Sequence, residues 1–97
     1  MSDPIRTREQ IENSWRIKLE AAAQASRRAH EQYSQILEEY NRAVADPDSP
    51  EGPTAELRLT LEQARNAEAA ARAEYFRVLK IFIDLVVHRK LPDAEAV

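Results

Sequence analysis

The sequence contains no cysteine, and this absence excludes disulfide bonds and thiolate chemistry. It has only one glycine, so a glycine-rich phosphate-binding loop is excluded as well. It also lacks a long apolar run, because the most apolar stretch, 78–87, is too short to span a bilayer and carries two charges. The first residues have no apolar secretory core. These absences predict a soluble, cytoplasmic protein with no membrane span.

The chain also lacks a strong excess of one charge. Fourteen basic and seventeen acidic residues give a formal net charge of −3, and the two signs alternate along the chain. Nucleic-acid binding requires a basic stripe that displaces counterions from phosphates, and no such stripe is present. We therefore expect no nucleic-acid partner.

The five prolines divide the chain into two periodic segments. Pro4 can occupy the first position of a helix capped by Asp3, whereas the three prolines of segment 46–53 would interrupt any helix. The sequence therefore predicts a single domain over residues 1–97. Its parts are a helix at 4–45, a proline-rich turn at 46–53, a second helix at 54–90 and a short tail at 91–97.

Both predicted helices carry a seam of residues spaced alternately four and three apart, the pattern of helices that pack along their length. In the first helix the seam comprises Trp15, Leu19, Ala22, Ser26, Ala29, Tyr33, Ile36, Tyr40 and Ala43. In the second helix it comprises Leu57, Leu61, Ala64, Glu68, Ala71, Tyr75, Val78, Phe82 and Leu85. The predicted fold is thus all-α, an antiparallel two-helix hairpin of coiled-coil type, in which facing residue numbers add to about 100.

The second helix has more apolar side chains near its end than one partner helix can cover. Each one buried is worth roughly 1.5 to 3 kcal/mol, so we expect another molecule to cover them. A second copy would close a four-helix bundle. The predicted homodimer interface comprises Phe76, Leu79, Phe82, Ile83 and Val86, with Ile11 and Trp15 of the first helix.

Two other occupants of this surface fit the same residues. A foreign helical protein could cover the apolar side chains, which would make the chain an adaptor or a chaperone-like module. A membrane surface could also cover them, since four basic residues lie around this end, but Asp84 interrupts the apolar face.

The sequence offers no arrangement that predicts catalysis, a cofactor or a metal site. Its glutamates fall mainly at positions exposed to solvent, where burial cannot shift a pKa. Glu68 is the exception, because it lies on the seam opposite Tyr33 and can either form a buried polar pair that fixes the register or lean out to water near Arg72. His30 and His88 are too far apart along the hairpin to share a metal, and no glutamate has a histidine three residues later, as di-iron bundles require. We therefore expect a noncatalytic structural or interaction protein.

The Pro-Asp-Ser-Pro segment at 47–50 resembles the proline-bracketed turn of type III secretion needle subunits, which are short helical hairpins that polymerise. In length and hairpin form, the chain also resembles the small WXG-type hairpins of bacterial export systems, although its turn contains no Trp-x-Gly motif. These resemblances imply a further alternative, a small secretion-system or assembly subunit.

Overall fold

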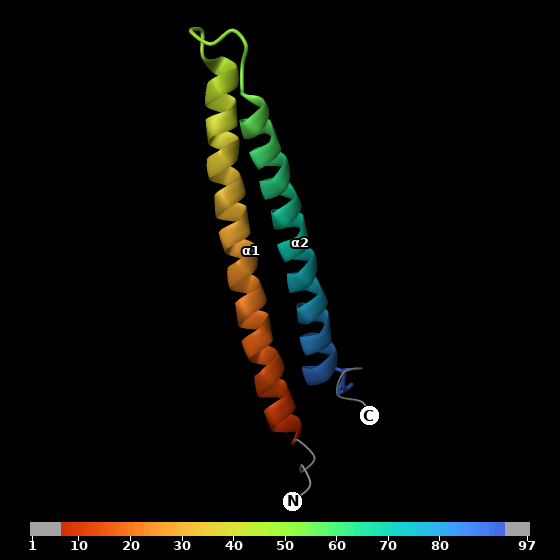
Figure 1. Cartoon of the computed structure of the whole chain (residues 1–97). Coiled ribbons are helices and arrows are strands. Elements are labelled where there is room, and N and C mark those ends of the chain that lie inside the picture. Colours follow the sequence, from red (N-terminus) through yellow and green to blue (C-terminus); the bar gives the residue numbers. More distant parts are fainter. Residues whose placement is uncertain (1–6, 93–97) are drawn as a thin grey trace, which may run out of the picture.

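The computed structural model describes residues 7–92, which form two antiparallel α-helices joined by a turn (Figure 1). Helix α1 runs from Arg8 to Ala45 and helix α2 from Ala55 to Val86. The described residues contain no strand. The molecule is an elongated rod with principal extents of 69 × 28 × 16 Å. These observations confirm the all-helical hairpin that the sequence predicts.

Helix α1 begins at Arg8, four residues later than the predicted start at Pro4. Thr7 has an extended backbone, and its hydroxyl accepts a hydrogen bond from the amide of Gln10 at 3.1 Å. The side chain of Gln10 in turn accepts from the amide of Thr7 at 2.9 Å, which completes a capping box. The Thr-x-x-Gln spacing was the overlooked signal. Asp3 and Pro4 lie outside the described residues.

Short-range hydrogen bonds stabilise the turn between the helices. The carboxylate of Asp46 accepts from the amide of Asp48, and the amide of Gly52 donates to the carbonyl of Ser49 at 3.0 Å. Gly52 has φ of 75°, a left-handed conformation that glycine adopts without a Cβ clash. Thr54 then caps α2 by accepting from the amide of Leu57. The only glycine of the chain thus lies where the turn requires one.

Helix α2 ends at Val86, four residues before the predicted end at Lys90. Arg89 adopts a left-handed conformation with φ of 57°, and the amide of Lys90 donates back to the carbonyl of Asp84. This reversal brings Pro92 into a buried position. The helix therefore stops early because the chain folds back over its end.

All the predicted seam residues are buried or half-buried. Contacts across the hairpin set the register: His30 meets Glu68, and the Arg16 guanidinium lies 5.6 Å from the ring centroid of Phe82. Facing residue numbers therefore add to about 98, two less than the sequence predicted. The heptad spacing correctly identified the face that each helix turns towards the other.

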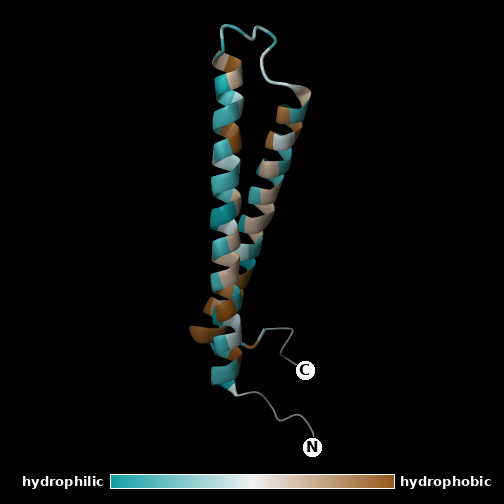
Figure 2. Cartoon of the chain, turned by 60° about the vertical axis from the view of Figure 1, so that its left-hand side comes forward, coloured by the Kyte–Doolittle hydropathy of each residue, from teal (hydrophilic) through white to brown (hydrophobic). Residues whose placement is uncertain are grey.

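The fully packed part of the hairpin lies in the half opposite the turn, which we call the open half. Its buried core comprises Ile11, Trp15, Ala22, Val78 and Leu85. No apolar residue of the turn half reaches the same burial among those described. Figure 2 shows apolar residues gathering in the open half. The stability of the hairpin therefore depends on a small number of contacts near one end.

Arg8 joins the beginning of α1 to the end of α2. Its guanidinium donates to the carbonyls of Leu85 and Arg89, both at 3.2 Å. The last turn of α2 has no basic residue of its own, so Arg8 supplies the positive charge that favours a helix C-terminus. It also provides a donor to the Leu85 carbonyl, one of the last carbonyls of α2, which a helix leaves without a backbone partner.

Replacing Arg8 with alanine is expected to lower the free energy of unfolding by about 1 kcal/mol, since the site is partly exposed and two charge-assisted hydrogen bonds are lost. Arg8→Lys keeps the charge without the forked geometry and should recover about half of that loss. Urea denaturation followed by circular dichroism measures both variants. Equal stability of Arg8→Ala and the wild type would show that this contact contributes nothing.

Candidate interaction surface

An apolar stripe runs along the side of α2 in the open half. It comprises Phe76, Leu79, Ile83 and Val86, whose spacing of three and four places them on one helical face. Phe76 is 57% exposed, Ile83 41% and Val86 40%, while Leu79 is half-buried. Val87 extends this surface and is 65% exposed. These side chains lie outside the hairpin seam and are open to a partner.

The other three residues of the predicted interface pack mainly inside the hairpin. Ile11 is 6% exposed and Trp15 is 4% exposed, because both lie in the core between the helices. Phe82 is half-buried against this core, and the guanidinium of Arg16 lies over its ring. These three therefore support the stripe from within and present little surface of their own.

Trp15 has both charged and apolar neighbours at this end of the hairpin. The Nζ atom of Lys18 lies 4.0 Å from its ring centroid, and Trp15 also lines a groove of about 470 Å³ together with residues of α2 and of segment 90–92. Among the described residues its buried indole Nε1 has no hydrogen-bond acceptor.

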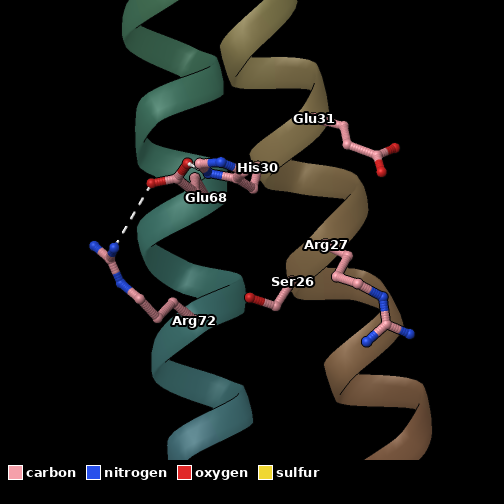
Figure 3. Close-up of a pocket in the computed structure, with 6 residues that line it drawn as sticks. All are labelled: Ser26, Arg27, His30, Glu31, Glu68 and Arg72. Carbon is pink, nitrogen blue, oxygen red and sulfur yellow. Dashed lines mark hydrogen bonds and ion pairs between the residues drawn. The ribbon is translucent and has the colours of Figure 1, made fainter.

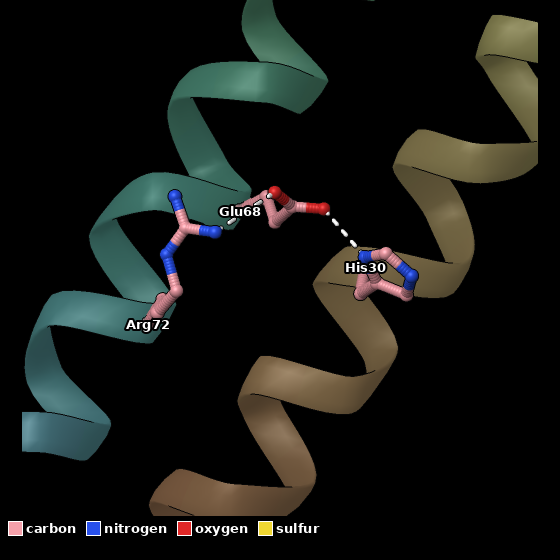
Figure 4. Close-up of polar contacts among 3 residues, drawn as sticks. All are labelled: His30, Glu68 and Arg72. Atoms are coloured by element: carbon pink, nitrogen blue, oxygen red, sulfur yellow. Dashed lines mark hydrogen bonds and ion pairs between the residues drawn. The ribbon is translucent and has the colours of Figure 1, made fainter.

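A cluster of three polar side chains lies near the middle of the rod, and its contact between His30 and Glu68 joins the two helices. The Nδ1 atom of His30 lies 2.7 Å from Oε2 of Glu68, and Nη1 of Arg72 lies 3.7 Å from Oε1 of the same carboxylate (Figure 4). The side chain of Glu68 is only 14% exposed, whereas His30 and Arg72 are largely exposed. The structure places Glu68 near Arg72, as the second alternative had it, and not in a buried polar pair with Tyr33. Its contact with the exposed His30 was not predicted.

A groove of about 420 Å³ surrounds this cluster on the surface. Of its six lining residues, four are exposed to solvent. Five of the six have charged or titratable side chains. Figure 3 shows Arg27 and Glu31 pointing away from α2. The groove is therefore open and bordered by solvated side chains, and it is not a closed cavity. The lining residues are Ser26, Arg27, His30, Glu31, Glu68 and Arg72.

Away from the seam, the described ion pairs on α2 lie on its solvent-facing side. Arg77 donates two hydrogen bonds to the carboxylate of Glu74, and this contact lowers the pKa of Glu74 below its ordinary value. Lys80 lies 3.7 Å from Asp84 with its own side chain 82% exposed. Such exposed pairs contribute little to stability because water screens them.

Within residues 7–92, no group of three or more histidine, aspartate or glutamate side chains is arranged to hold a metal ion. Neither helix has a stretch that is long and apolar enough to cross a membrane. Comparison with protein-family models, curated proteins and solved structures finds no match. The interaction surface must therefore be interpreted from its own chemistry.

Proposed function

We propose that this chain is a noncatalytic helical hairpin that associates with a second copy of itself through its open half. The stripe Phe76, Leu79, Ile83 and Val86, in which all but the half-buried Leu79 are exposed, is the observation that carries this proposal. Single exposed apolar residues are ordinary on protein surfaces, but three on one helical face, with a half-buried leucine between them, form a continuous patch. Partner binding would remove this patch from water.

A stable protein–protein interface buries about 800 Å² from each partner. A second copy provides an identical apolar stripe, and a two-fold axis allows the two stripes to cover each other. At the contact, two hairpins supply the four helices of a bundle.

Multi-angle light scattering after size exclusion tests the proposal directly. At tens of micromolar, the expected mass is twice the 11.1 kDa of the chain, falling towards the monomer mass on dilution. A constant monomer mass at these concentrations, with full helicity by circular dichroism, would overturn self-association. The same stripe would then be assigned to a foreign helical partner.

A further inference from the structure

The side of α2 that carries the apolar stripe changes character along the rod. One heptad position reads Arg58, Arg65, Arg72, Leu79 and Val86. The neighbouring position reads Glu62, Ala69, Phe76 and Ile83. Residues seven apart lie on nearly the same face of a helix, so both rows follow one side of α2. This side is charged in the turn half and apolar in the open half.

The charged part of this side is exposed to solvent. Arg58, Arg65 and Arg72 are all exposed, and only Arg72 has an acidic partner among the described residues, at 3.7 Å from Glu68. The groove at the middle of the rod adjoins the same side, since Arg72 lines it and lies one helical turn from Phe76. A partner that covered the whole length of α2 would have to desolvate these arginines.

Two hairpins lying side by side over their full length would meet this difficulty in either direction. If both turns lay at the same end, contact between the two stripes would place each arginine row against the identical row of the second copy. If the turns lay at opposite ends, each apolar stripe would face an arginine row. Like charges at close range and desolvated unpaired charges are both unfavourable.

We infer that the second copy overlaps only the open half and points in the opposite direction, an orientation that rests on the proposed self-association. The two stripes then cover each other about a two-fold axis near residue 81, while both arginine rows remain in water. Ala55, the first residue of α2, then lies about 39 Å along the rod from the axis, so the dimer is on the order of 100 Å long. The charged groove stays open in this arrangement.

The absence of cysteine permits a direct measurement of this orientation, because one introduced cysteine provides the only labelling site. A spin label at Arg58→Cys lies about 35 Å along the rod from the centre of the stripe. Double electron–electron resonance on the dimer is expected to give about 70 Å between labels. If the hairpins paired over their full length with both turns at the same end, the distance between the labels would be less than about 30 Å. If they paired over their full length with the turns at opposite ends, it would be about 35 to 40 Å.

Charge reversal provides a second measurement. Arg65→Glu is expected to leave the dimer dissociation constant within about twofold, because Arg65 remains in water. A larger shift in either direction would place the arginine row in the interface and overturn the inference. Light scattering on the same samples separates the two proposals. A dimer mass with a short label distance overturns only the orientation, whereas a monomer mass overturns self-association and the orientation with it.

Discussion

Ile83→Asp is expected to raise the dimer dissociation constant at least about 100-fold while leaving the hairpin folded. Ile83 lies in the middle of the apolar stripe and is 41% exposed in the single chain. The symmetric dimer contains two copies, so the variant loses two apolar contacts and places two unpaired carboxylates in the interface. A total effect of about 3 kcal/mol or more corresponds to the expected change in affinity.

Ile17→Asp is the matched control. Ile17 is also an isoleucine in the open half and is 67% exposed, but its helical neighbours are polar or small. Those neighbours are Asn13, Ser14, Glu20 and Ala21. Sedimentation velocity over a concentration series should show Ile17→Asp dimerising like the wild type and Ile83→Asp remaining monomeric. If both variants dimerise equally well, the stripe is not the interface.

Leu85→Ala is expected to cost about 3 kcal/mol of stability, the largest loss at a single position of the core. Leu85 is the only side chain described as fully buried, with no exposed surface. Leucine-to-alanine changes at such sites cost roughly 2 to 5 kcal/mol, because transfer free energy is lost and a cavity remains. The buried core is small, so few other contacts can compensate.

Leu59→Ala serves as the control for this substitution. Leu59 is 55% exposed and lies in the turn half of α2, away from the buried core. Its replacement should change stability by less than about 0.5 kcal/mol. Urea denaturation below the dimerisation range compares the two variants. A small effect of Leu85→Ala would show that the open half does not carry the stability of the hairpin.

The heptad spacing predicted much of the fold because it records a physical requirement. A helix that packs along its length must place an apolar or small residue at each crossing, so the seam is visible in the sequence. The prolines likewise located the turn, since they cannot continue a helix. The predicted ends of the two helices were less accurate. A capping box at Thr7 competed with a proline start at Pro4, and the left-handed Arg89 ended α2 early.

The interface prediction shows a second limit of periodicity. Ile11 and Trp15 have the apolar character expected of an interface, but the hairpin itself buries them. Composition shows how much apolar surface a helix carries, whereas the division of that surface between core and exterior depends on the register of the two helices. Phe76, Ile83 and Val86 remain exposed because they lie beside the seam and not on it.

The sequence by itself determined two helices, the turn that reverses them and the side of each that faces the other. These features depend on local conformational preferences and on a seven-residue repeat. Both can be read from the sequence without knowing the tertiary structure. Only the tertiary structure decided that Arg8 caps the end of α2 and that His30 joins Glu68. Both contacts link residues far apart in the chain, and a shift of one or two residues in register would separate them. Tertiary packing likewise left the apolar stripe of α2 exposed, because a single neighbouring helix covers only one side.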